Sequence, residues 1–218
     1  MELSYIVKFA PAFLKAIVLT AELAALGIAA ALALGAAAAV AIYHRTPALD
    51  KLASAYVELA RNTPLMIQLF FLYFGLPRAG VRLDAATCAV IGLAFLGGGY
   101  MAESIRGGLE AVGKSQIESG LCIGLTRLQL MRHVVWPQAL AAAMPSLSAN
   151  AIFLIKETSV FSVVALADIM YVANDLMMEG HSNETNLMMV TAYLVLIFPV
   201  SLICSWGEKK VRSAGFGG

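Results

Sequence analysis

Two charged residues and two hydroxyl residues stand together in the apolar second half of the chain. Lys156 and Glu157 interrupt an otherwise uncharged run over residues 134–167, and Thr158 and Ser159 follow them directly. A charge at membrane depth is costly and is retained where it has a partner or faces a wet cavity. A zwitterionic amino acid needs a donor for its carboxylate and an acceptor for its ammonium group, and this cluster offers both. A second interpretation stays open, in which Lys156 and Glu157 only mark the outer end of a membrane helix.

A second group of polar residues falls in an earlier apolar stretch. Thr63 and Gln68 flank Pro64, and proline lacks the backbone N–H that a helix interior uses, so a carbonyl is freed nearby. We expect these residues to break or to line a membrane span. Glu103 and Arg106 lie three residues apart, and we expect them to pair on one helix face rather than to contact a ligand.

The elements that carry these residues are membrane helices. The chain has 218 residues, of which 60% are hydrophobic and 13% charged, and its mean hydropathy is +0.80, which is far above that of a soluble domain. A net charge of +1 is too small to create the positive field that nucleic-acid binding requires. The three cysteines and three histidines are isolated in the sequence, so neither a disulfide framework nor a metal site is expected.

Five apolar stretches come close to the roughly 20 residues that a helix needs to cross a bilayer. They are residues 23–43, 62–77, 85–102, 134–155 and 185–207. The first continues back toward Lys15, the second begins near Lys51, and the glycines at 97–99 loosen the end of the third. We therefore predict an all-α membrane protein with about five transmembrane helices, which forms a single transmembrane domain over residues 1–218.

Lysine and arginine are distributed unevenly between the two sides of this topology. With the N-terminus outside, ten of the fifteen basic residues fall in cytoplasmic segments, in agreement with the positive-inside rule. We therefore expect a multi-pass protein with its N-terminus outside and its C-terminus inside. The first apolar run is longer than a signal-peptide core of about 7 to 15 residues, so we expect it to remain in the mature protein.

The polar segment between the third and fourth spans has a helical pattern. Ile117, Leu121, Leu125 and Leu128 recur at spacings of four and three, which predicts one amphipathic helix at the cytoplasmic membrane surface. A helix that only rests on lipid usually has a strongly basic polar face. Here Lys114 is offset by nearby glutamates, so a protein partner is at least as well supported as lipid.

The same segment contains the literal pattern of a phosphate-binding loop, Gly108, four residues, Gly113, Lys114 and Ser115. Such a loop needs a buried strand before it and a helix after it, inside an α/β domain. Here the preceding residues end a membrane helix, and a loop of about thirty residues is too short to build such a domain. We interpret the match as chance.

Four separated motifs occur in order along the chain. They are Arg61-Asn62-Thr63-Pro64 with Gln68; Tyr100 with Glu103, Arg106, Gly107 and Gly108; Glu118-Ser119-Gly120, Gly124 and, after nine intervening residues, Val134-Val135-Trp136-Pro137; and Leu154-Ile155-Lys156-Glu157-Thr158-Ser159. Together they resemble the ABC-type importer permeases, in the branch of the polar amino-acid permeases. The chain departs from that family at Ser119-Gly120, where two alanines are usual, and at Trp136, where leucine is usual.

The resemblance implies the membrane-spanning subunit of an ATP-driven importer of polar amino acids, and not an enzyme. Glu157 would suit a cationic side chain as well as an α-ammonium group, which favours cationic amino acids. It implies that the loop helix docks on a separate ATPase chain that uses ATP, while this chain binds no cofactor. The implied coupling residues are Glu118, Ser119, Gly120, Gly124 and Pro137. Further implied partners are a second permease subunit, alike or different, and an extracytoplasmic solute-binding protein, in the bacterial cytoplasmic (inner) membrane. Glu157 ranks above Lys156 as a substrate contact.

Two other classes of function have less support in the sequence. An intramembrane enzyme needs a nucleophile with a base, or paired aspartates, within its spans, and the predicted spans contain neither a histidine nor two aspartates. A secondary carrier commonly has repeated halves with matching broken helices, and no such repeat is visible. The transported amino acid stays open, with arginine, histidine and lysine ahead of glutamine.

Overall fold

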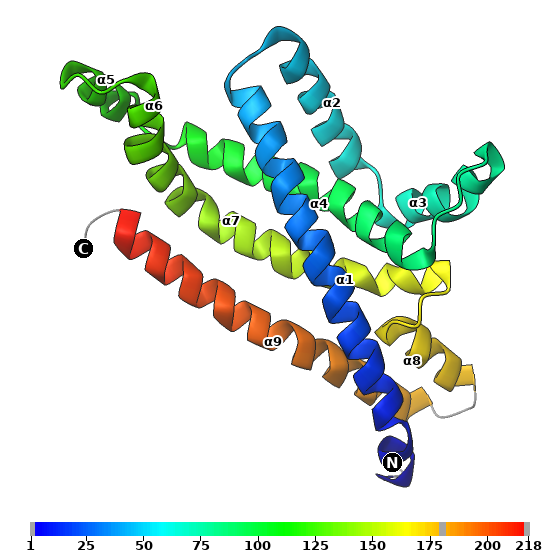
Figure 1. The fold of residues 1–218 in the computed structure, drawn as a ribbon. Helices are drawn as coiled ribbons and strands as arrows, with labels where there is room; N and C mark the ends of the chain where they lie inside the picture. The colour runs from blue at the N-terminus through cyan, green and yellow to red at the C-terminus, as the bar shows by residue number, and fades with distance from the viewer. Residues whose placement is uncertain (1–2, 179–181, 216–218) are drawn as a thin grey trace.

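The computed structural model describes residues 3–178 and 182–215, and every regular element within them is helical (Figure 1). Four helical segments in this part of the chain are long and apolar enough to cross a membrane. They are Ser4–Tyr43, Ala85–Glu110, Arg127–Val164 and Asn183–Val211, and a shorter apolar segment spans Leu65–Ala79. The predicted class, an all-α membrane protein, is confirmed.

The predicted second span is divided into two helical pieces. α2 (Pro47–Asn62) ends at Thr63, and α3 (Leu65–Phe70) continues through a π-helical turn, η1 (Phe71–Gly75), and a 3-10 turn, η2 (Leu76–Ala79). Thr63 is extended, with φ −113° and ψ 122°, as the residue before a proline prefers. The expected break at Pro64 is confirmed, and no single second helix runs from near Lys51 to Pro77.

α1 (Leu3–Tyr43) and α4 (Ala85–Glu110) form the most extensive helix pair. Their axes approach closely because Gly35 faces α4, where an added Cβ would lie 2.6 Å from Met101 Cβ. Small residues permit this close approach between membrane helices, whose association depends on van der Waals packing. α4 also packs on α2 and α7, so it is the central helix of the bundle.

The third span is longer than the sequence indicated. α4 continues past Ala102 to Glu110, and the glycines at 97–99 are buried inside it. A Cβ on Gly97 would lie 2.6 Å from Leu154 Cδ1, and one on Gly99 would lie 2.9 Å from Ala60 Cβ. The prediction that these glycines loosen the helix end is wrong, because they allow α2 and α7 to pack against the middle of α4.

The fourth span begins earlier than predicted. α5 (Lys114–Cys122) and α6 (Arg127–Leu130) form the loop after α4, and α6 runs through a π-helical turn, η3 (Met131–Val135), into α7 (Trp136–Glu157). Pro137 lies in the first turn of α7, which directly continues the helical turns before it. The wider π-helical turn before it lets the chain continue as a helix past the proline.

α7 leads into a 3-10 segment, η4 (Thr158–Val164), followed by α8 (Ile169–Met178) and α9 (Ser182–Gly215). Figure 1 places α5, α6 and the C-terminal end of α9 at one end of the bundle, and the N-terminal end of α1 with α8 at the other. The hydroxyls of Tyr5 and Thr185 lie 3.3 Å apart, which joins the starts of α1 and α9. The start of α1 and the C-terminal end of α9 therefore lie at opposite ends of the bundle (Figure 1).

Candidate functional site

The predicted amphipathic loop helix is two helices joined by a sharp corner at Gly124. Gly124 has φ +85°, a conformation that favours glycine. The N–H of Leu125 donates to the Gly120 carbonyl at 3.1 Å, and that of Gly124 donates to the Leu121 carbonyl at 3.0 Å. These two bonds form a Schellman motif, which ends a helix. The prediction of one continuous helix is therefore wrong.

The second helix of the corner has its own start signal. The Thr126 hydroxyl accepts from the Gln129 N–H at 3.3 Å, and Gln129 Oε1 accepts from the Thr126 N–H at 2.9 Å. This reciprocal pair is a capping box, which satisfies two backbone donors that would otherwise lack partners. The corner between α5 and α6 is thus a hydrogen-bonded structure and not a slack connection.

α5 lies directly on α6 because residue 120 has no side chain. Gly120 is buried, and a Cβ there would overlap Leu130 Cδ1. Gly124, by contrast, has no atom within 4 Å of the position that a Cβ would take, so its role is conformational. Two of the five predicted coupling residues therefore shape the corner, one by close packing and the other by its backbone angle.

The outer surface of the corner combines polar and apolar side chains. Glu118 and Ser119 are exposed, and the side chains of Ile123 and Leu128 are each 78% exposed. Ile117, from the predicted apolar stripe, instead packs partly buried against the core. Exposed apolar side chains gathered beside polar ones are typical of a protein interaction surface. Pro137, the remaining predicted coupling residue, is exposed in the first turn of α7.

The phosphate-loop pattern lies in a different structural context from a phosphate-binding loop. Gly108 is inside α4, where a Cβ would overlap the backbone carbonyl of Ala139. Lys114 opens α5, and no strand occurs in the part of the chain that the structure describes. The glycine therefore serves the packing of α4 on α7.

At the break in the second span, Gln68 supplies the missing hydrogen bonds. Its Nε2 donates to the Thr63 carbonyl at 3.0 Å and to the Ala60 carbonyl at 3.3 Å. These carbonyls lie where α2 ends and no helical N–H follows to bind them. Gln68 Oε1 is buried and has no hydrogen-bond partner among the described residues.

A cavity of about 400 Å³ lies beside this break. Thr63 and Gln68 line it, together with apolar residues of α2, η1 and α4 such as Leu59, Phe71 and Phe95. An apolar pocket with a few polar groups is the usual form of a small-molecule site. The two predicted residues of the second span therefore do lie on a cavity wall.

The four residues at the end of α7 differ in their surroundings. Lys156 is exposed, Glu157 and Ser159 are half-buried, and Thr158 is fully buried with its hydroxyl donating to the Ile155 carbonyl at 2.7 Å. Neither Lys156 nor Glu157 takes part in an ion pair among the described residues. Glu157 is thus a half-buried carboxylate without an ion-pair partner in this part of the chain.

The fold brings the two predicted polar groups to neighbouring elements. α3, which carries Gln68, packs against η4, which begins at Thr158 directly after Glu157. About ninety residues separate these elements in the sequence. The break in the second span and the end of the fourth span therefore lie side by side.

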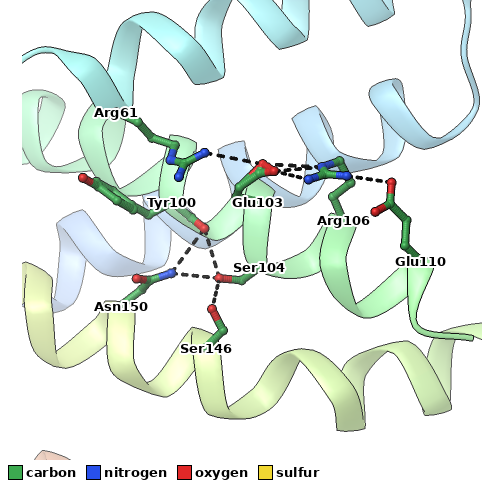
Figure 2. Close-up of polar contacts among 8 residues, drawn as sticks. All are labelled: Arg61, Tyr100, Glu103, Ser104, Arg106, Glu110, Ser146 and Asn150. Carbon is green, nitrogen blue, oxygen red and sulfur yellow. Dashed lines mark hydrogen bonds and ion pairs between the residues drawn. The ribbon is translucent and has the colours of Figure 1, made fainter.

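An ion-pair chain that sequence reasoning only partly found runs along α4 (Figure 2). Arg106 pairs with Glu103 and, at 2.6 Å, with Glu110, and Arg61 Nη1 of α2 lies 3.5 Å from Glu103 Oε2. The predicted pairing of Glu103 with Arg106 is confirmed. The link from Glu103 to Arg61 was missed because it joins two helices.

A hydrogen-bonded group beside this chain was missed entirely. Asn150 Nδ2 of α7 donates to the Ser104 hydroxyl at 2.8 Å and to the Tyr100 carbonyl at 3.2 Å, and the hydroxyls of Ser104 and Ser146 lie 2.7 Å apart (Figure 2). Ser146 and Asn150 are four residues apart and therefore on one helix face. The sequence signal that could have revealed this group is the pair Ser146 and Asn150, two polar residues four positions apart in an apolar run.

Asp168 is a second missed residue, at the start of α8. Its Oδ1 accepts from the N–H of Tyr171 at 2.8 Å, which makes it the N-cap of α8. Burial raises the pKa of the Asp168 carboxyl to about 6. Its Oδ2 has no hydrogen-bond partner among the described residues. The sequence signal that could have revealed this N-cap is an aspartate just before an apolar helical stretch.

Comparison with known proteins agrees with this geometry. The model of the binding-protein-dependent transport system inner membrane component family matches residues 28–213. The chain is 36% identical to the probable amino-acid ABC transporter permease protein PatM of Vibrio harveyi, over 98% of this chain and 97% of that protein. It is 36% identical to the probable glutamine ABC transporter permease protein GlnM of Bacillus subtilis, over 87% of this chain and 88% of that protein.

Solved structures show the same arrangement of helices. A chain of an amino acid ABC transporter crystallised with histidines superposes with a TM-score of 0.89 at 29% identity, over 96% of this chain and 99% of that chain. A chain of the MetNI methionine ABC transporter in an inward-facing conformation superposes with a TM-score of 0.79 at 17% identity, over 97% of this chain and 99% of that chain. At 17% identity, the similarity to the MetNI chain shows only a shared fold.

The fold and the sequence similarity define a membrane permease subunit of an ABC importer. The chain belongs to the binding-protein-dependent transport system inner membrane component family. The resemblance stated from the sequence motifs is thus confirmed, and the chain is a transport component and not an enzyme. In importers of this family ATP is used by a partner ATPase, and a binding protein delivers the substrate.

Proposed function

We propose that this chain forms half of the translocation path of an importer of polar amino acids, with cationic amino acids as its first substrates. The observation that carries the proposal is Glu157, a half-buried carboxylate without an ion-pair partner among the described residues, at the end of α7 directly before η4, the segment that packs on α3. A carboxylate in such a position binds a positively charged group through charge-assisted hydrogen bonds. Burial strengthens that preference, because an unpaired charge near the membrane interior is costly.

The remaining predicted contacts take supporting roles in this proposal. Thr63 and Gln68 line the cavity beside the helix break, where the free Gln68 oxygen would accept from a polar group of the substrate. Ser159 is half-buried next to Glu157, and exposed Lys156 would meet a substrate carboxylate. Thr158 already donates to a backbone carbonyl, so its contribution would be to hold the end of α7 in place.

The proposed partners are inferred from the corner between α5 and α6 and from the family. We propose that the surface formed by Glu118, Ser119, Ile123 and Leu128 docks on a separate ATPase subunit, and that Gly120, Gly124 and Pro137 shape the helices behind it. ATP would then be bound by the partner and no cofactor by this chain. A second permease subunit, alike or different, and an extracytoplasmic solute-binding protein complete the proposed importer.

The proposed orientation in the bacterial inner membrane has the N-terminus outside and the C-terminus inside. It rests on the ten-to-five distribution of basic residues, and α5, α6 and the C-terminal end of α9 share one end of the bundle (Figure 1). A reporter fused after Gly218 should therefore be in the cytoplasm. Activity of a periplasm-specific reporter at that site would contradict the proposed orientation.

The direct test of the substrate proposal is Glu157→Gln in the importer reconstituted with its ATPase and binding protein. Loss of a charge-assisted hydrogen bond should lower uptake of arginine or lysine by roughly ten to a hundred fold, with basal ATP hydrolysis unchanged. The permeases GlnM and GlnP are named for glutamine, so glutamine uptake is measured in parallel and should fall less. Glu58→Gln, which makes the same change at an exposed position of α2, is the matched control and should leave uptake unchanged. Unchanged uptake of every amino acid by Glu157→Gln would refute the proposal.

A further inference from the structure

A polar hollow of about 620 Å³ opens between the end of α1, the start of α2 and the end of α4. Its wall consists of Ile42, Tyr43, Arg45, Asp50, Arg106 and Glu110. It lies apart from the cavity that Thr63 and Gln68 line, which shares none of these residues. The ion-pair chain of Figure 2 ends at this hollow, because Arg106 and Glu110 belong to both.

The position of the hollow corresponds to one boundary of the membrane. The uncharged part of α1 covers residues 23–43, which is about the length that crosses the hydrocarbon core. Arg45 is the first charged residue after this run, and the half-buried Tyr43 stands just before it. Aromatic residues gather at the headgroup level of a bilayer, and basic pockets between helices at that level bind lipid headgroups.

Two charged groups in the hollow have unused binding capacity. Arg45 is exposed, and its guanidinium group forms no ion pair or hydrogen bond with the described residues. Asp50 accepts one long hydrogen bond, from Ser54 Oγ at 3.4 Å. Arg106 is already paired with Glu103 and Glu110. The hollow therefore offers a free guanidinium for an anion and a free carboxylate for a cation.

We propose that this hollow binds the headgroup of a phospholipid that carries both a phosphate and a primary ammonium group, as in phosphatidylethanolamine. Arg45 binds the phosphate, since a guanidinium matches phosphate oxygens in charge and geometry. Asp50 and Glu110 accept from the ammonium group, while Ile42 and Tyr43 border the glycerol and the first acyl carbons. A purely anionic headgroup is disfavoured, because the same two carboxylates would repel it.

The test uses the purified importer complex with its ATPase, in nanodiscs or detergent with defined lipids. Native mass spectrometry counts retained lipid, and the unfolding midpoint reports binding, with phosphatidylethanolamine, phosphatidylcholine and phosphatidylglycerol as probes. We expect retention of phosphatidylethanolamine above the other two. Arg45→Gln should weaken its binding about five-fold, since one basic side chain near a headgroup contributes about that factor. Asp50→Asn should remove the preference for ethanolamine over choline.

Matched controls come from the same helix. Lys51→Gln and Glu58→Gln change exposed charges on α2 that do not line the hollow, and they should leave lipid retention unchanged. Arg45→Lys keeps the charge and should retain most of the binding, which separates lost contact from misfolding. Soluble phosphoethanolamine and free arginine or glutamine are added as separate probes.

Three outcomes would overturn the proposal. The first is equal retention of phosphatidylethanolamine and phosphatidylcholine by the unaltered protein. The second is wild-type retention by both Arg45→Gln and Asp50→Asn. The third is an equal stabilisation by soluble phosphoethanolamine or by a free amino acid, which would make the hollow a site for a soluble zwitterion rather than for a lipid.

Discussion

The side-chain amide of Gln68 donates a 3.0 Å hydrogen bond to the backbone carbonyl of Thr63, across the break in the second span. The same amide nitrogen reaches the Ala60 carbonyl at 3.3 Å. One buried side chain therefore replaces the helical N–H groups that are lost where the chain leaves α2 and re-enters a helix after Pro64.

Replacement of Gln68 by leucine should destabilise the protein. Gln68→Leu keeps a side chain of similar size but leaves two carbonyls without their donor, which should cost about 1 to 3 kcal/mol. The unfolding midpoint of the purified protein in detergent measures this loss. Gln116→Leu, at an exposed position of α5, is the control. An unchanged midpoint for Gln68→Leu would mean that water satisfies these carbonyls instead.

The contact between Gly120 and Leu130 should control coupling to the ATPase. Gly120→Val places methyl groups where Leu130 Cδ1 now lies, so α5 must move away from α6 and ATPase association should fall. Leu130→Ala in the same chain creates space and should restore part of the association. Co-purification of the ATPase and ATP-driven uptake measure both effects.

A suitable control for that experiment is Gly107→Val, because no atom lies within 4 Å of a Cβ at Gly107. It should leave association unchanged. If Gly120→Val retained full association, the close packing of the two helices would not be needed for docking.

The Arg61–Glu103 ion pair should stabilise the contact between α2 and α4. Glu103→Gln removes it and also weakens the pairing of Arg106, which keeps Glu110. Both partners of the Arg61 pair are partly exposed, with 41% and 27% of their side-chain surfaces accessible, so the expected loss is only about 1 kcal/mol. A double-mutant cycle with Arg61→Gln, followed by thermal unfolding, isolates the pair. Additive effects of the two substitutions would show that the pair contributes nothing.

Stability should depend on pH through Asp168. Its pKa of about 6 in the folded protein lies above the value of about 3.9 in an unfolded chain. The folded state therefore holds this proton more tightly. The resulting stabilisation is full below about pH 4 and is lost as the pH rises to about 6, by up to about 3 kcal/mol.

The asparagine variant removes this dependence. Asp168→Asn keeps the acceptor for the Tyr171 N–H but carries no charge, so it should unfold at a higher temperature than the unaltered protein at pH 7.5. At pH 3.5 the two midpoints should be nearly equal. Asp175→Asn, at an exposed site on the same helix, should behave like the unaltered protein at both values. The result that contradicts this expectation is a lower midpoint for Asp168→Asn at pH 7.5.

Local chemistry in the sequence determined the class of the protein and several of its breaks. Long uncharged runs predict membrane helices because backbone groups in lipid must bond within the helix. Pro64 predicted the division of the second span, and the spacing of Glu103 and Arg106 predicted their pairing. The break and the ion pair depend on residues within about four positions of one another, and a span depends on one continuous run, so the order of residues alone suffices to find them.

Only the tertiary structure decided which of these segments meet. The glycines at 97–99 suggested a loose helix end, yet they are the contact through which α2 and α7 pack on α4. The stripe from Ile117 to Leu128 suggested one helix, but packing of Gly120 on Leu130 and the left-handed Gly124 divide it. The contact of α3, which carries Gln68, with η4, which begins directly after Glu157, depends on the crossing of helices far apart in the sequence. No local pattern records such a crossing, because it is set by which small residues allow two helix surfaces to approach.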